Sequence, residues 1–329
     1  SSIEYSYQDH FTIEDEVIKA EPISTYQVKG GMMYNVNDDL NVFFNTGLVE
    51  KAPIMDNVIY YDGTVASDPA NEKFVHNEFG VNYKFGKLGL NASAYNTDWQ
   101  DRNLTKSVTT GQGDSGDTDV IFLTGVNQKH SGVELETNYM VNDMLDLMFV
   151  ASFGNWKFDG DANGNYQETE YNSEGQAVGY TTTEYAYALD GLYVGDMPQT
   201  SYVLGVTLKP IKDLRIQAIH KMYDKNYSDW SPSAREFDGT NDDADRAQVW
   251  EAPSYNRLDL HMSYKLPKVK DLDMMLTANI FNVLDEVYVQ DAVDNSQYNG
   301  YGSKQHLPHN AEVFLGTPRY ANIGLSIGF

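Results

Sequence analysis

The sequence contains no cysteine and no long run of apolar residues. Without cysteine, disulfide bonds and cysteine-ligated metal sites are excluded. Without about 20 consecutive apolar residues, a membrane-spanning helix is excluded as well. A transmembrane β-barrel is not excluded by this absence, because its strands present apolar residues only at every second position.

Basic residues are scarce: 23 Lys and Arg stand against 48 Asp and Glu, and the formal net charge is -25. Much of the acid lies in one segment, residues 157–196, which contains eight acidic residues and a single Lys. Nucleic acids bind to surfaces rich in Lys and Arg, so the charge balance argues against nucleic acid and other polyanions as partners.

Helical periodicity is absent at useful length, whereas apolar and polar residues alternate along many segments. In 321–329 one face consists of Ala321, Ile323, Leu325, Ile327 and Phe329, and the other of Asn, Gly and Ser. Segments 257–266 and 271–280 repeat this pattern. We count about eleven such strands from residue 23 onward, each with one apolar and one small or polar face.

Short and long connections alternate strictly between these strands. The short turns are 37–40, 86–87, 142–143, 210–213 and 267–270. The long polar connections are roughly 48–73, 105–118, 157–196, 225–252 and 290–317. Short turns at one end and long loops at the other are typical of an outer-membrane barrel rather than a soluble sandwich. The predicted fold is therefore an all-β, antiparallel transmembrane barrel wall with short periplasmic turns and long extracellular loops.

The parity of the strands bears on the start of the chain. An odd number of strands starts and ends on opposite sides of the membrane. If Phe329 lies at the periplasmic rim, the first of eleven strands therefore begins outside, and residues 1–22 belong to an external loop and to the end of a preceding strand. The chain opens in a polar, aromatic stretch without a signal peptide. We therefore interpret residues 1–329 as the C-terminal part of a longer barrel.

Several phrases resemble one known family. They are NTGLVEKAP (45–53), EKFVHNEFGVNY (72–83), GVNQKHSGVELE (125–136), NIFNVLDEVY (279–288) and the alternating C-terminal strand. In this order, over about 300 residues, they resemble the C-terminal half of the TonB-dependent outer-membrane receptors, particularly the Bacteroidetes-type ones.

The resemblance implies a 22-stranded barrel with an N-terminal plug, of which this chain supplies strands 11 or 12 to 22. It implies uptake of a scarce nutrient, such as a glycan, a peptide, an iron chelate or cobalamin. The implied surroundings are outer-membrane lipid and lipopolysaccharide, the TonB complex acting through a plug that this chain lacks, and in some members a surface lipoprotein.

The segment DGDANGNYQETE (159–170) fits the calcium-loop pattern D-x-[DN]-x-[DN]-G-x5-E. An EF-hand needs helices on both sides of this loop, and neither flank has helical periodicity, so a calcium sensor of that type is excluded. Asp159, Asp161, Asn163 and Glu170 remain candidate ligands for Ca2+ in an extracellular loop. The alternative is a soluble acidic loop. No other cofactor is expected.

Aromatic residues in the long loops have two interpretations. Those at strand ends are expected to form an interfacial girdle. Those deep in the loops, Trp230, Trp250, Tyr298 and Tyr301, are candidates to stack on a sugar ring or an aromatic chelator.

No catalytic site is predicted. Asp259, His261 and Ser263 share one strand face, but such neighbours are about 6.6 Å apart, beyond hydrogen-bonding reach. A small stand-alone outer-membrane pore or adhesin is the alternative hypothesis to a receptor. An outer-membrane hydrolase would need a nucleophile and a base, which we do not find in the sequence.

Overall fold

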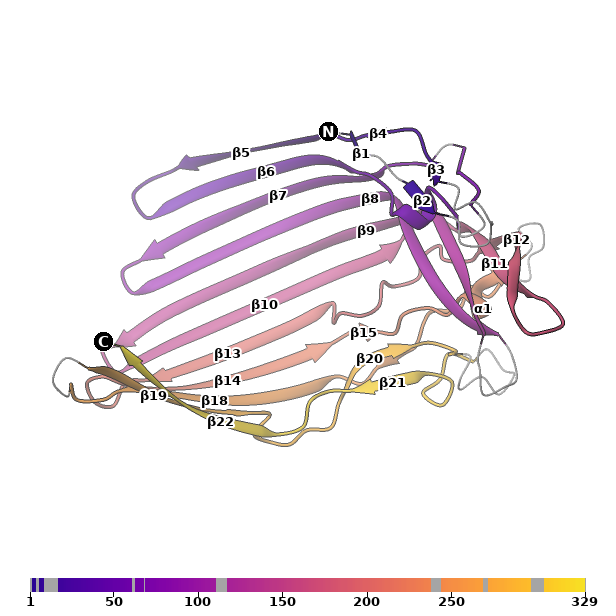
Figure 1. The fold of residues 1–329 in the computed structure, drawn as a ribbon. Helices are drawn as coiled ribbons and strands as arrows, with labels where there is room; N and C mark the ends of the chain where they lie inside the picture. The colour runs from indigo at the N-terminus through magenta and orange to yellow at the C-terminus, as the bar shows by residue number, and fades with distance from the viewer. Residues whose placement is uncertain are drawn as a thin grey trace.

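The computed structural model describes residues 2–3, 6–8, 17–60, 63–67, 69–110, 117–237, 244–268, 272–296 and 305–328. Eleven strands form the continuous path of a curved, 14-stranded antiparallel sheet, in which each pairs with the next of the eleven along the chain (Figure 1). They are β5 (Gln27–Asn35), β6 (Leu40–Lys51), β7 (Glu72–Phe85), β8 (Leu88–Thr110), β9 (Asp117–Asn142), β10 (Leu145–Phe158), β13 (Thr200–Leu208), β14 (Leu214–Asp224), β18 (Tyr255–Lys265), β19 (Asp273–Phe281) and β22 (Tyr320–Gly328). The predicted antiparallel fold with about eleven strands is confirmed.

Short elements occupy the long connections at one end of the sheet. They are η1 (Met55–Asn57), β11 (Ala162–Tyr171), β12 (Ala177–Tyr187), β15 (Asn226–Tyr227), α1 (Pro232–Arg235), β16 (Glu236–Phe237), β17 (Glu251–Ala252), β20 (Val289–Val293) and β21 (Glu312–Leu315). Before the sheet, β1 (Ser2–Ile3) pairs with β4 (Ile23–Ser24), and β2 (Ser6–Gln8) pairs with β3 (Val17–Lys19). Across the described residues, no helix has the length and apolar character needed to cross a membrane.

One face of the sheet is apolar across all eleven strands, because the strand registers align the alternating side chains. One row of directly opposed residues, from β22 to β10, is Ile323, Ala278, Met262, Ile216, Leu208 and Leu145. A second row, from β10 to β5, is Ala151, Leu135, Ala92, Val81, Val42 and Tyr34. Ile323 is 80% exposed, so protein does not cover this face near β22. An exposed apolar face of this kind fits a lipid-facing barrel wall.

The opposite face is polar and carries ladders of side-chain hydrogen bonds. Asn82 donates to Asn41 (2.9 Å), and Asn91 donates in turn to Asn82. Among the C-terminal strands of the same face, Asn279 donates to Asn322 and hydrogen-bonds to His261, both at 2.8 Å. Cross-strand polar pairs of this type stabilise a face that is in contact with water.

Two predicted loops contain more strand than we expected. The segment 105–118 was predicted to be a polar connection, but β8 continues to Thr110 and β9 begins at Asp117. Within 157–196, β11 and β12 form a hairpin. Segment 105–118 contains four Thr, and segment 157–196 contains six Tyr and four Thr. The β-propensity and cross-strand pairing of these residues outweigh the polar composition on which we based the loop prediction.

Candidate ligand-binding face

The hairpin of β8 and β9 bends where it leaves the sheet, and its outer part lies across the end that carries the long connections (Figure 1). The register shifts twice at the bend, between Trp99 and Arg102 and between Arg102 and Leu104. Asp101 and Gly125 adopt positive φ angles of 54° and 69°. Bulges of this kind re-aim a strand. We call the outer part, residues 103–110 and 117–124, the arm.

The arm packs on a hydrophobic core built from the loops, which we call the loop cluster. Its members are Ile121, Leu123, Val126, Phe158, Ala162, Tyr187, Leu189, Leu192, Tyr227, Trp230 and Val249. Trp230 is at its centre, with its ring edge-on to Phe158 at 6.4 Å and tilted against Tyr187 at 5.9 Å. The loops are therefore a packed layer with its own apolar core.

A cluster of charges joins the arm to this layer. Lys106 of the arm forms an ion pair with Asp229, and its ammonium group lies 5.1 Å from the centre of the Trp230 ring. Asp196 hydrogen-bonds to Asp291 beside them. We call Lys106, Asp196, Asp229 and Asp291 the acidic junction. Partial burial, followed by the charges of Asp229 and Asp291, raises the pKa of Asp196 to about 7.

Three chain segments approach closely at the acidic junction. Asp229 N donates to Ala292 O (2.8 Å), and Asp294 N donates to Asp229 O (2.7 Å). A Cβ atom on Gly195 would lie 2.6 Å from the backbone nitrogen of Asp229, so this position accepts only glycine without a shift of the backbone. The junction therefore fixes the spacing of three loops.

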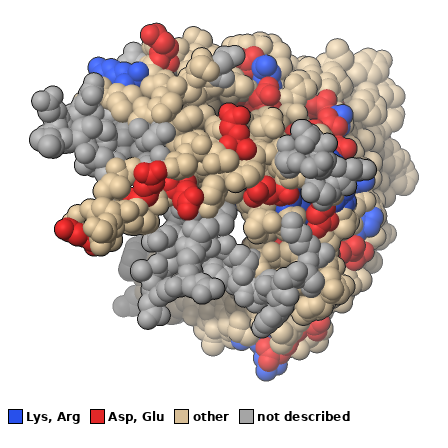
Figure 2. Space-filling model, turned by 90° about the vertical axis from the view of Figure 1, so that its right-hand side faces the viewer, with Lys and Arg blue, Asp and Glu red and all other residues tan. Residues whose placement is uncertain are grey.

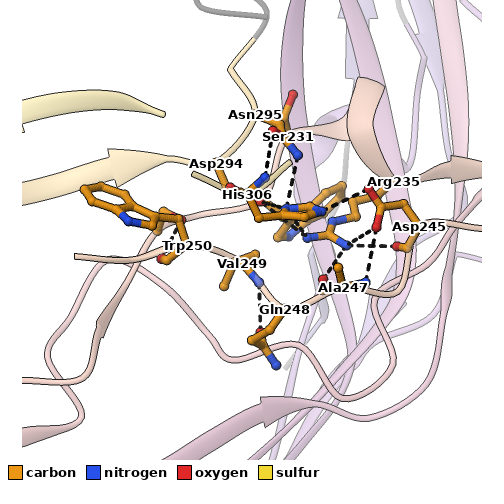
Figure 3. Close-up of polar contacts among 12 residues, drawn as sticks. Ser231, Arg235, Asp245, Ala247, Gln248, Val249, Trp250, Asp294, Asn295 and His306 are labelled. Carbon is orange, nitrogen blue, oxygen red and sulfur yellow. Dashed lines mark hydrogen bonds and ion pairs between the residues drawn. The ribbon is translucent and has the colours of Figure 1, made fainter. Parts of the chain in front are cut away.

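A second polar centre surrounds Arg235, which is fully buried at the end of α1 (Figure 3). Its guanidinium group donates to the carbonyl oxygens of Asp245 (2.8 Å) and Ala247 (2.7 Å) and to the carboxylate of Asp294 (3.3 Å). His306 lies between Asp294 (2.5 Å) and Asp245 (3.0 Å). We call Arg235, Asp245, Asp294 and His306 the Arg235 network. It ties the connection after β14 to the connection after β20.

The outer surface of the loop layer shows more acidic than basic side chains (Figure 2). This distribution agrees with the acidic composition of the loops in the sequence. A ligand that approaches this face meets negative potential first.

The four predicted aromatic contact residues have different surroundings. Trp230 is 1% exposed in the loop cluster, so a ligand reaches its ring only if the layer opens. Trp250 is half-buried, and its ring points away from the Arg235 network in Figure 3. Tyr298 and Tyr301 lie outside the described residues. A ligand-contact role for these residues stays a prediction.

The predicted calcium ligands do not meet at one point. Asp159 pairs with Lys129 (2.8 Å), and Asp161 accepts two hydrogen bonds from Arg246 (2.9 and 2.8 Å), which lower the pKa of Asp161. Asn163 and Glu170 lie on β11, about 23 Å apart by the rise of a strand. Glu170 accepts a hydrogen bond from Thr181. Calcium binding by these residues stays a prediction, and it requires the hairpin to rearrange.

The phrase NIFNVLDEVY has a clear structural role at the start of the last connection. Asn282 is fully buried with φ 50°, and its backbone N–H donates to Asp259 Oδ1 (2.9 Å). Its side chain accepts from Glu286 N (3.0 Å) and donates to the carbonyl oxygens of Glu286 (2.9 Å) and Thr317 (3.2 Å). Asp285 accepts from Arg319 N (2.9 Å). The phrase therefore fixes the connection to β18 and to the segment that leads into β22.

Replacement of Asn282 by Gly is expected to destabilise this turn by about 1–2 kcal/mol. Glycine keeps the left-handed backbone without strain, so the variant removes only the side-chain hydrogen bonds. The urea midpoint of the folded barrel measures the effect. Asn322→Ala is the control, since that exposed side chain accepts one hydrogen bond; an equal loss in both variants would contradict the proposed role of Asn282.

The sequence did not indicate Lys106, Asp196 or Arg235 as important residues. Each lies in a polar connection, and its partners are distant along the chain, as for Lys106 and Asp229 or Arg235 and Asp294. The sequence signal for Lys106 and Arg235 is a basic residue in an acid-rich segment, and this signal does not show which acidic residue forms the ion pair.

An exposed apolar face, a polar inner face and a packed loop layer at one end define the wall of an outer-membrane β-barrel. The family model described as TonB dependent receptor-like, beta-barrel, matches residues 5–283. The chain belongs to this family. The family consists of outer-membrane receptors and transporters, so the sheet lies in the outer membrane with the loop layer outside.

Solved structures share the fold at low identity. The ferric-catecholate import receptor Fiu from E. coli K12 is 14% identical, with a TM-score of 0.54 over 99% of this chain and 40% of its own. The copper transporter OprC is 13% identical, with a TM-score of 0.59 over 93% and 39%. The ferric yersiniabactin receptor FyuA from Yersinia pestis is 15% identical, with a TM-score of 0.54 over 95% and 39%. The chain thus spans about two fifths of these structures. No curated protein sequence matches the chain.

Proposed function

We propose that the protein is a TonB-dependent transporter that takes up a scarce nutrient, and that the loop layer binds this nutrient at the outer surface. The proposal rests on the family match, which covers most of the barrel wall. The loop layer supports it, because its apolar core holds the arm across the end of the sheet. In this proposal the TonB complex acts through a plug outside residues 1–329, and outer-membrane lipid and lipopolysaccharide surround the apolar face. A surface lipoprotein is a further proposed partner. No bond-making chemistry is proposed.

The charge of the loop layer favours a neutral or cationic cargo. The acidic junction has three carboxyl groups against one ammonium group, and the outer surface is predominantly acidic (Figure 2). Like charges repel at such a surface, so an anionic chelate binds less favourably than a neutral glycan or a basic peptide.

The experiment starts with the native polypeptide extracted from outer membranes. We expect its intact mass to correspond to a chain several hundred residues longer than residues 1–329, as the lengths of the solved structures imply. In a planar bilayer, we expect no conductance without an energy source. A chain of about this length with spontaneous conductance would instead support the stand-alone pore.

Binding to Trp250 is tested with a panel of one neutral oligosaccharide, one basic peptide, Cu2+ and one ferric catecholate. The ligand that binds to the purified full-length protein is then titrated into Trp250→Ala, and we expect roughly tenfold weaker binding from the loss of stacking. Tyr171→Ala is the matched control, because Tyr171 is 45% exposed in the same layer. Equal affinities of wild type and Trp250→Ala would remove Trp250 from the site.

A further inference from the structure

We propose that Lys106 and Asp229 condense to form an amide bond between their side chains, which fastens the arm covalently to the connection after β14. Asp196 supplies the acid–base group for this reaction. The reaction involves side chains of the protein alone and leaves the cargo unchanged, so the inference does not rest on the proposed function.

The two reacting groups are held together at the acidic junction. The ammonium group of Lys106 forms an ion pair with Oδ2 of Asp229, and their side chains are only 21% and 25% exposed. The backbone of Asp229 is fixed on both sides, by hydrogen bonds to Ala292 O (2.8 Å) and from Asp294 N (2.7 Å). Groups held in contact react with effective molarities that reach about 10⁵–10⁸ M, which favours a condensation that does not proceed between separate molecules in water.

A proton donor lies beside this ion pair. Asp196 and Asp291 hydrogen-bond to each other, and since a carboxylate oxygen only accepts hydrogen bonds, one of these two groups is protonated. Asp196 N donates to Tyr227 O (3.2 Å), and Gly195 passes directly against the backbone of Asp229. A carboxyl group in this place can donate a proton to the leaving oxygen and accept one from the attacking nitrogen.

The reaction balances without any further reactant. The ammonium group of Lys106 loses a proton, and the electron pair left on Nζ forms the new bond to Cγ of Asp229. Trp230 N donates to Oδ1 of Asp229 (3.0 Å) and stabilises the negative charge that develops there, as an oxyanion-hole donor does. The Cγ–Oδ2 bond then breaks, and Oδ2 leaves as water with two of the three ammonium protons, relayed by Asp196. A cation and an anion thus become one neutral amide.

An ion pair on the barrel wall has all but one of these parts. Lys221 Nζ lies 2.9 Å from Asp259 Oδ2, and Oδ1 of Asp259 accepts a hydrogen bond from Asn282 N (2.9 Å). The other ion-pair partner of Asp259 among the described residues is Arg257 (3.8 Å), whose guanidinium group keeps its protons. Without a neighbouring carboxyl group, this pair is expected to stay unlinked, and it serves as the internal control.

The test is tryptic peptide mapping of the full-length protein extracted from outer membranes. Trypsin cleaves after a free Lys106, but not after one whose amine is bound in an amide. We therefore expect a branched peptide that joins segments 103–129 and 226–235 and is lighter than their sum by one water molecule. Lys221 and Asp259 are expected in linear peptides alone.

Two variants separate the reaction from the fold of the junction. Asp196→Asn keeps a hydrogen-bonding side chain but cannot relay a proton, so we expect the branched peptide to form roughly a hundredfold more slowly after refolding from urea into detergent. Lys106→Arg keeps the positive charge and is expected to give no branched peptide. Asp190→Asn, an exposed position in the same connection as Asp196, is expected to react at the wild-type rate. Linear peptides alone in the wild type, or an unchanged rate in Asp196→Asn, would overturn the proposal.

Discussion

Replacement of Gly316 by Ala is expected to destabilise the barrel by about 3 kcal/mol or more. A Cβ atom at this position would overlap the ring of Tyr288. That ring is buried and stacks on Tyr255 at 4.3 Å, and its hydroxyl group accepts a hydrogen bond from Arg257 (3.1 Å), so the ring has no free space into which to move. A displacement of the backbone that relieves this overlap would break the hydrogen bond from Gly316 N to Tyr288 O (2.9 Å).

The midpoint of urea unfolding of the full-length protein, followed by the mobility shift of the folded barrel on gels, measures this effect. Gly30→Ala is the matched control, because nothing lies within 4 Å of a Cβ atom there. Tyr288→Ala removes the obstructing ring, so Gly316→Ala is expected to cost much less in that background. Equal costs in both backgrounds would show that the Tyr288 ring is not the obstacle.

Replacement of Arg235 by Leu is expected to destabilise the closed loop layer by about 3–5 kcal/mol. The variant leaves the buried Asp294 carboxylate without its guanidinium partner, and it leaves the carbonyl oxygens of Asp245 and Ala247 without their donor. The hydrogen bonds of Arg235 in the described part of the chain go to loop residues and not to strands of the barrel wall, so we expect the unfolding midpoint of the wall to stay unchanged.

Hydrogen exchange in 244–252 and 289–296 measures the opening of the layer. The control is Arg246→Leu, since Arg246 is 46% exposed and its ion pair with Asp161 is a surface pair worth at most about 1 kcal/mol. A similar increase in exchange for both variants would contradict the central role of Arg235.

The barrel wall was predictable because its physics is local. Alternation in segments such as 321–329 follows from one lipid face and one wet face, and short turns set the register. The arm was missed because the segment 105–118 is polar, although residues 105–110 pair with residues 117–122 as strands. The Arg235 network was beyond sequence reasoning, since Arg235 and His306 are 71 residues apart and meet only through two folded loops.

The buried core of the described chain lies largely in the loop layer rather than in the wall, and this position separates two tasks. The wall is held by its ladder of backbone hydrogen bonds, whereas the loop layer is held by Trp230, Tyr187 and their neighbours. Residues on the outer surface of the layer can therefore change, and in the proposed transporter the choice of cargo changes with them, while the cluster beneath keeps the loops in place. If the proposed function holds, surface substitutions alone can change the specificity, without a new barrel.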